Sequence, residues 1–205
     1  MKNIFLLFLT FVFVKDLDAQ FIKNYGVKIG IATSDQYVRE HLPFDDIDPT
    51  IVLHPNRNYI GLTIGLTAEI LNYPPFSLVF EGNFIQKGFR DEFTAGNITY
   101  LMKSRYDYLS ISLLTKTKII LGLINPYLLV GPRIDTEISS TGGVIYNGRN
   151  KYVPGLVAGI GIEIPLNKIN LLAEVTYDFN FGKLYEDSNI TVSYESYVFR
   201  LGIIL

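Results

Sequence analysis

The sequence predicts an all-β protein: an eight-stranded antiparallel up-and-down transmembrane β-barrel with short periplasmic turns and four long extracellular loops. Three observations predict this fold. Apolar residues recur at every second position in eight segments, which is the period of a β-strand. The connections between these segments alternate between short and long, as they do in outer-membrane barrels. Apolar residues make up 48% of the chain and charged residues only 19%, a composition that excludes a disordered protein.

Residues 1–19 have the pattern of a secretory signal peptide. A positive charge near the start precedes a short, mostly apolar run over residues 4–14, and Ala19 supplies a small residue for cleavage. The run is too short for a membrane-spanning helix, which needs about 20 apolar residues. Leu17 and the charges around it depart from the usual cleavage pattern, and an uncleaved anchor or a buried strand is the alternative. We expect cleavage after Ala19, which leaves residues 20–205 as one barrel domain.

The eight predicted strands follow from the alternation of apolar and polar positions. They cover residues 27–31, 60–69, 76–87, 109–113, 126–138, 156–164, 171–179 and 197–205. Short connections are expected near residues 71–76, 119–125 and 165–169, and long ones near residues 34–57, 88–106, 139–152 and 182–193. A strand of about 10–12 residues, tilted by about 40°, rises roughly 25–30 Å, which is the height of a bilayer core.

Alternation alone does not say which face of a barrel meets lipid, because a soluble lipocalin-like barrel alternates in the same way. The polar positions here carry many glycines and few charges, as expected of a crowded lumen and not of a water-facing surface. The central charges also balance, four against four. We therefore predict a filled lumen closed by a structural ion-pair network. Its members are Lys28, Lys116, Arg133 and Arg200 against Glu69, Glu81, Glu163 and Glu174.

Aromatic residues near the predicted strand ends suit the interfacial girdles of such barrels. The expected girdle residues are Tyr25, Phe76, Tyr108, Tyr127, Tyr177 and Tyr197.

The sequence gives little support for a disulfide scaffold, nucleic-acid binding, a metal site or catalysis. Absence of cysteine excludes a disulfide scaffold and a cysteine nucleophile, and a net charge of −2 makes nucleic acid an unsuitable partner. His41 and His54 flank several aspartates in the first long loop, but their spacing matches no metal motif. The lumen carboxylates could act as acid–base groups, but no histidine lies on a predicted strand to complete a nucleophile–base pair. We therefore expect no catalytic residues, no cofactor and no metal.

Several strand motifs resemble the PorT-like outer-membrane β-barrel proteins of Bacteroidota. The matching stretches are residues 61–69, 76–81, 86–88, 108–116, 126–133, 155–163 and 199–205. Two positions depart from the family pattern: Ser112 stands where proline is common, and the chain ends in Leu205 where many barrels end in phenylalanine. The resemblance implies an integral outer-membrane barrel, and some members of that family belong to the type IX protein secretion and gliding machinery.

These observations favour a non-enzymatic barrel in the outer membrane of a Gram-negative bacterium, with a structural or interaction role through its extracellular loops and no open general pore. The expected partners are outer-membrane lipid, lipopolysaccharide and the barrel insertion machinery. The alternatives are a PorT-like secretion component that contacts secretion-system proteins, a lipid-modifying barrel enzyme and a soluble lipocalin-like carrier.

Overall fold

The computed structural model describes residues 22–40, 51–53, 57–95, 98–142, 150–181, 185–186 and 190–205. The predicted signal peptide, residues 1–19, and both histidines, His41 and His54, lie outside the described residues. Among the described residues, no helix is long and apolar enough to cross a membrane.

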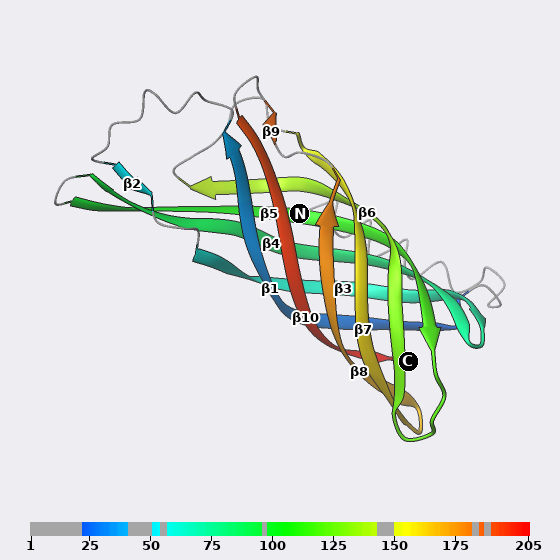
Figure 1. The fold of residues 1–205 in the computed structure, drawn as a ribbon. Coiled ribbons are helices and arrows are strands. Elements are labelled where there is room, and N and C mark those ends of the chain that lie inside the picture. Colours follow the sequence, from blue (N-terminus) through cyan, green and yellow to red (C-terminus); the bar gives the residue numbers. More distant parts are fainter. Residues whose placement is uncertain are drawn as a thin grey trace, which may run out of the picture.

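Eight long strands form a closed antiparallel barrel (Figure 1), which confirms the predicted fold. They are β1 (Asn24–Glu40), β3 (Arg57–Tyr73), β4 (Phe76–Ala95), β5 (Ile98–Lys118), β6 (Asn125–Gly142), β7 (Tyr152–Leu166), β8 (Ile169–Asn180) and β10 (Ile190–Ile204). Each pairs with its neighbour in sequence, and β1 pairs with β10 from Gly26↔Ile204 to Glu40↔Ile190. This last ladder leaves the barrel wall without an open edge, which is the condition for a sheet to span lipid.

Two short strands lie within the predicted long connections. β2 (Ile51–Leu53) pairs with the end of β4, and β9 (Tyr185–Glu186) pairs with β10. Neither was predicted, because two or three residues are too few to show a periodic pattern.

The strands are longer than predicted, at 12 to 21 residues. The predicted loop at residues 88–106 is wrong in particular: β4 and β5 continue through it as a paired ribbon to Ala95↔Ile98. The apolar alternation that marks a strand in sequence depends on contact with lipid at one face. Where the strand leaves the membrane the alternation fades, although the backbone ladder continues, so the sequence pattern misses this part of the strand.

The predicted short connections close the other end of the barrel. Pro74 and Pro75 join β3 to β4, and residues 167–168 join β7 to β8, with Asn167 at a positive φ of 42°. Asparagine tolerates this left-handed backbone better than most residues, so it suits a two-residue hairpin turn.

Apolar side chains face outward, as predicted. Leu62, Ile64 and Leu66 on β3 are 47%, 52% and 53% exposed, whereas the alternating Thr63 and Thr67 are buried. This arrangement is the reverse of a soluble carrier, whose exterior must be polar. The buried interior is therefore the lumen. Its apolar part includes two clusters, Ala32, Ile85, Phe89, Tyr106, Tyr108, Val153 and Val198 toward the loop end, and Val79, Leu114, Tyr127, Leu129 and Val157 toward the turn end.

Candidate functional site

The main chemical feature of the described lumen is a set of twelve charged side chains in three layers. The turn-end layer contains Glu69, Lys116, Lys118 and Glu163. The central layer contains Lys28, Glu81, Glu174 and Arg200. The loop-end layer contains Lys87, Arg133, Asp135 and Asp178. Each layer has two cations and two carboxylates, so each is neutral by itself.

Strand periodicity directs these side chains inward. On β8, Glu174, Thr176 and Asp178 occupy every second position and all are buried, while Val175 between them faces outward. The register of the strands then decides which inward residues meet at one height. Glu174 and Arg200 are direct partners across β8 and β10, for example.

The turn-end layer is centred on Lys116 of β5. Its Nζ lies 2.7 Å from Glu69 Oε1 and 2.8 Å from Glu163 Oε2. The remaining oxygens are also occupied, because Lys118 Nζ lies 3.1 Å from Glu163 Oε1 and Asn24 Nδ2 donates to Glu69 Oε2 at 2.6 Å. Both carboxylates are therefore bonded through both oxygens.

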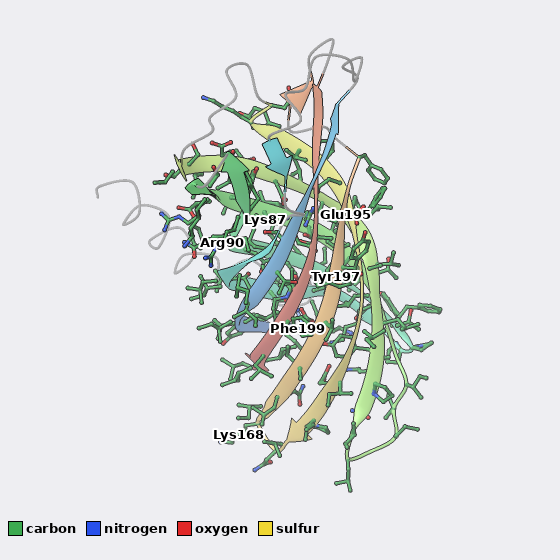
Figure 2. All side chains as sticks on the ribbon, turned by 60° about the vertical axis from the view of Figure 1, so that its left-hand side comes forward. Lys87, Arg90, Lys168, Glu195, Tyr197 and Phe199 are labelled. Carbon is green, nitrogen blue, oxygen red and sulfur yellow. The ribbon has the colours of Figure 1, made fainter. Side chains whose placement is uncertain are left out.

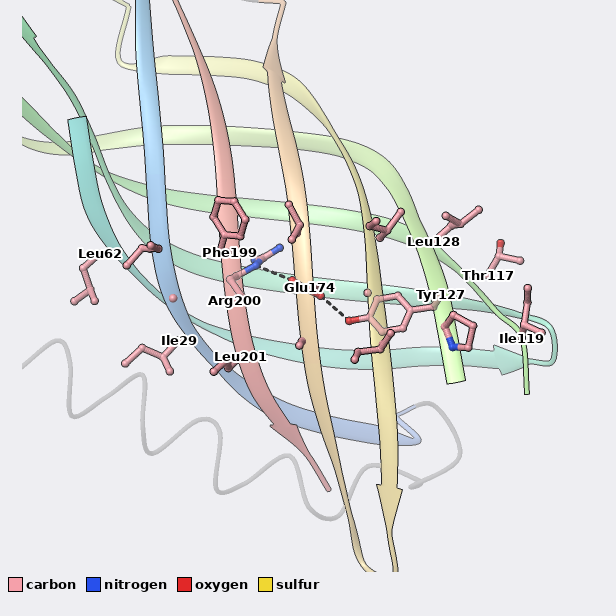
Figure 3. A pocket seen from close by; sticks show the side chains of 18 residues that line it. Ile29, Leu62, Thr117, Ile119, Tyr127, Leu128, Glu174, Phe199, Arg200 and Leu201 are labelled. Carbon is pink, nitrogen blue, oxygen red and sulfur yellow. Dashed lines mark hydrogen bonds and ion pairs between the residues drawn. The ribbon is translucent and has the colours of Figure 1, made fainter. Parts of the chain in front are cut away.

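In the central layer, two cations share two carboxylates in a ring. Lys28 contacts Glu81 and Glu174, the latter at 2.8 Å, and Arg200 lies 3.0 Å from Glu81 Oε2 and 2.7 Å from Glu174 Oε1. The Tyr127 hydroxyl donates to Glu174 Oε2 at 3.0 Å, and Figure 3 shows this bond in line with the contact between Glu174 and Arg200. In the same view Ile29, Leu62 and Leu201 point away from the lumen, toward the lipid side.

The loop-end layer is held by Lys87 and Arg133. Lys87 Nζ lies 2.9 Å from Asp135 Oδ2 and 3.3 Å from Asp178 Oδ2. Arg133 contacts Asp178 directly, lies 3.3 Å from Asp135 Oδ1 and donates to Asn180. All four charged side chains are almost fully buried. Buried charge of this kind is tolerated only where it is paired and hydrogen-bonded.

The space between the central and loop-end layers is nearly filled. It holds an internal cavity of about 10 Å³, bordered by both arginines and by the hydroxyls of Thr63 and Thr176. That volume is about enough for one water molecule. Close packing also depends on glycine, because a side chain at Gly161 would overlap the ring of Tyr127. The lumen at this height is therefore closed by side chains.

All eight residues predicted for the ion-pair network lie in these layers, with exposures of 1–6%: Lys28, Glu69, Glu81, Lys116, Arg133, Glu163, Glu174 and Arg200. Four members were missed: Lys87, Lys118, Asp135 and Asp178. A signal for them was present in the sequence. Each is an even number of residues from a predicted lumen residue on the same strand, so alternation assigns it to the same face.

The prediction of the aromatic girdle is partly wrong. Tyr25, Phe76 and Tyr197 are exposed on the outside, and Tyr177, which is partly exposed, packs against Tyr197 with ring centroids 5.0 Å apart. Tyr108 and Tyr127, however, are buried in the lumen. The alternation of inward and outward positions along β5 and β6 explains why these two tyrosines are buried. On β5 the outward residues Leu109 and Ile111 are odd-numbered, and on β6 the outward residue Leu128 is even-numbered, so Tyr108 and Tyr127 fall on the inner face.

Among the described residues, no group of three or more histidine, cysteine, aspartate or glutamate side chains could hold a metal ion. The carboxylates of the three layers instead accept bonds from lysine, arginine, asparagine and tyrosine.

Comparison with solved structures shows the barrel fold through the match to OprG, given below. No curated protein matches the sequence. Among solved structures, the outer membrane protein OprG from Pseudomonas aeruginosa is similar, with a TM-score of 0.54 and 14% identity over 92% of this chain and 99% of OprG. Neisserial surface protein A has a TM-score of 0.48 at 11% identity over 89% of this chain and 98% of its own, and Ail of Yersinia pestis has 0.41 at 16% identity over the same shares.

The model of the family described as "Outer membrane protein beta-barrel domain" matches residues 19–186, which is most of the chain. Together with the closed eight-stranded barrel and its apolar exterior, this match assigns the protein to the bacterial outer membrane. The chain belongs to the outer membrane protein beta-barrel domain family.

Proposed function

We propose that this barrel is a closed, non-enzymatic outer-membrane protein that acts through the surfaces at its loop end, and that it does not conduct solutes as a general porin. The three neutral ion-pair layers carry this proposal. They stack along the lumen, and in each layer cations from one wall reach carboxylates on other strands.

Opening the lumen would require breaking these contacts. Removing one partner from a buried ion pair costs about 3–5 kcal/mol, because the remaining charge stays buried without compensation. Separating a whole layer breaks several such contacts at once. Thermal fluctuation therefore opens such a lumen rarely, and a permanently conducting state is disfavoured.

The same contacts support the absence of catalysis. A nucleophile–base pair needs side chains that are within hydrogen-bond reach and available to substrate. Glu81 and Glu174 are instead bonded to both Lys28 and Arg200, and nearly all their surface is buried. Ion pairing is the role that fits them.

Planar-bilayer recording tests the closed lumen directly. The wild-type barrel should give no steady single-channel steps, whereas a variant that truncates the centre, Lys28→Ala/Tyr127→Ala/Arg200→Ala, should conduct if it inserts. Exposed residues outside the layers supply a control, Lys23→Ala/Tyr73→Ala/Lys168→Ala, which should stay silent. Steady current through the wild-type barrel would overturn the proposal.

A second candidate is a PorT-like component of type IX secretion or gliding. It is supported by the resemblance of the strand motifs, of which residues 126–133 lie on β6 and include Arg133 of the loop-end layer. Deletion of the gene should then leave secreted cargo inside the cell. Normal secretion in the deletion strain would contradict this role, but it would not contradict the proposal of a closed lumen.

The partners that suit either role are outer-membrane lipid and lipopolysaccharide at the apolar exterior, and the insertion machinery at the last strand. That strand, β10, closes the barrel against β1.

A further inference from the structure

The short connection between β5 and β6 carries a run of exposed apolar side chains at the turn end of the barrel. We name residues 119–124 the apolar turn. Its sequence is Ile-Ile-Leu-Gly-Leu-Ile, which contains no polar side chain. The exposed fractions of its five large side chains run from 48% at Ile124 to 86% at Leu123. A contiguous exposed apolar surface of this kind marks a place that binds a membrane or another protein.

The neighbouring connection at the same end of the barrel is polar. β6 and β7 pair down to Asn125↔Glu163, so the apolar turn and the β7–β8 turn stand on adjacent strands. The β7–β8 turn consists of Asn167 and Lys168, which are both exposed. Figure 2 shows Lys168 at the turn end, far from Lys87, which lies toward the loop end. The apolar character is therefore a property of one turn and not of every turn at this end.

The polar side chains on either side of the apolar turn are directed away from its surface. Lys118 reaches into the lumen, where it belongs to the turn-end ion-pair layer. Asn125 is buried, and its Oδ1 accepts a hydrogen bond from the backbone N–H of Leu121 at 3.0 Å. The backbone N–H of Ile119 donates to the carbonyl of Pro126 at 2.9 Å. Two backbone donors of this irregular segment are thus satisfied within the protein, which favours contact with a medium of low polarity.

The outer face of β6 connects the apolar turn with the lipid-facing wall of the barrel. The outward positions that follow Ile124 on this strand are Pro126, Leu128 and Val130, none of which is polar. Leu128 is the register partner of Ile160 on β7, and these two side chains are 59% and 61% exposed. The apolar surface on β6 therefore runs from the membrane-spanning wall into the turn without interruption. This continuity favours lipid as the partner of the turn.

We propose that the apolar turn is inserted into the periplasmic leaflet of the outer membrane, where phospholipid acyl chains cover it. Insertion removes its large side chains from water, and the gain is proportional to the apolar area buried. The embedded barrel holds the turn beside the bilayer at all times, so no partner has to be recruited from solution. The β7–β8 turn stays at the level of the headgroups, where the ammonium group of Lys168 remains in water.

The turn end consequently meets the bilayer unevenly, deeper at the β5–β6 turn than at the β7–β8 turn. This placement does not depend on the proposed function, which concerns the lumen and the loop end.

Single cysteines that carry a nitroxide spin label test the placement, because the chain contains no cysteine of its own. The three variants are Leu123→Cys in the apolar turn, Lys168→Cys in the polar turn and Leu128→Cys on the lipid-facing wall. Each barrel is reconstituted into vesicles of phosphatidylethanolamine and phosphatidylglycerol. Electron paramagnetic resonance then compares collisions of the label with oxygen, which concentrates in hydrocarbon, and with a water-soluble nickel complex. A gel shift on heating shows that each variant is folded.

The ratio of oxygen to nickel collisions at position 123 should match the ratio at position 128 and exceed the ratio at position 168 several-fold. Adding Ile120→Asn/Leu121→Asn to Leu123→Cys should abolish that excess, because burying polar side chains in hydrocarbon is unfavourable. The matched control adds the same kinds of substitution beside the polar turn, Leu166→Asn/Ile169→Asn, and should leave the ratio at position 123 high.

A ratio at position 123 as low as that at position 168 would overturn the proposal. An equal loss of the excess in the control would also overturn it, because the apolar side chains of the turn would then not be its cause. A label at position 123 that is exposed to nickel in the vesicles but protected in native outer membranes would show that a protein covers the turn instead of lipid. The collision ratio does not depend on whether the lumen conducts, so this proposal and that of a closed lumen fail separately.

Discussion

Lys87 on β4 reaches Asp178 on β8, with Nζ 3.3 Å from Oδ2, and these two strands stand on opposite sides of the barrel. Three strands separate them in either direction around the wall. One lysine side chain therefore spans the lumen, and it also contacts Asp135 on β6 at 2.9 Å. The loop-end layer joins three parts of the wall that share no backbone ladder.

Replacing this lysine should destabilise the barrel strongly. Lys87→Met keeps the length of the side chain but removes its charge, and it leaves Asp135 and Asp178 with Arg133 alone. Because one carboxylate is then poorly compensated while buried, we expect the free energy of unfolding to fall by about 3–5 kcal/mol. Denaturant titration of the refolded barrel in detergent micelles measures the change. Lys151→Met, at an exposed position, should change it by less than about 0.5 kcal/mol; a similarly small effect at Lys87 would contradict the cross-lumen contact.

Arg133 offers a separate test of the same layer, because its guanidinium contacts Asp178, Asp135 and Asn180. Arg133→Ala should cost a few kcal/mol of unfolding free energy by leaving buried carboxylate oxygens without their partner. Arg133→Lys should cost less, since it restores the charge but not the forked geometry. Unfolding in denaturant ranks the three proteins. A loss below about 0.5 kcal/mol for Arg133→Ala is typical of exposed sites and would exclude a lumen role.

Sequence alternation was sufficient to predict the eight strands, their antiparallel closure and the inward direction of the charged residues. It was not sufficient to predict which charges meet. Contact across the lumen depends on the stagger of the strands around the barrel, and that quantity is a property of all eight ladders together. Lys87 and Asp178 are 91 residues apart in sequence, and only the complete register brings them to the same height.

The wrong assignment of two girdle tyrosines also came from leaving strand position out of account. Tyr108 and Tyr127 were assigned to the lipid interface from their residue type, although the alternation of their own strands directs them inward. In the lumen, Tyr127 donates to Glu174 and its ring lies 4.7 Å from Lys116 Nζ. A tyrosine can serve in either place, because its ring is apolar and its hydroxyl needs a partner. Position in the strand is therefore the better guide.

Glycine at position 161 should be required for the packing of Tyr127. A Cβ at Gly161 would overlap the Tyr127 ring, whereas a Cβ at Gly82 would meet nothing within 4 Å. Gly161→Ala should therefore lower the free energy of unfolding by about 1–3 kcal/mol, the usual cost of overpacking. Gly82→Ala should be neutral or slightly stabilising, because alanine loses less conformational freedom than glycine in a strand. Equal effects of the two substitutions in denaturant titrations would show that the lumen is not tightly packed around Tyr127.

The direction of the aromatic side chains can be read with single tryptophans, because the chain contains none of its own. Tyr197→Trp places the indole on the exposed outer face, and Tyr108→Trp places it in the buried lumen. In vesicles that contain brominated phospholipid, the fluorescence of the first variant should be quenched and that of the second should persist, because bromine quenches only indoles that it touches. A gel shift on heating serves as the folding control for both variants. Quenching of Trp fluorescence to the same extent in the two proteins would show that residue 108 faces lipid and would reverse the inner and outer faces of β5.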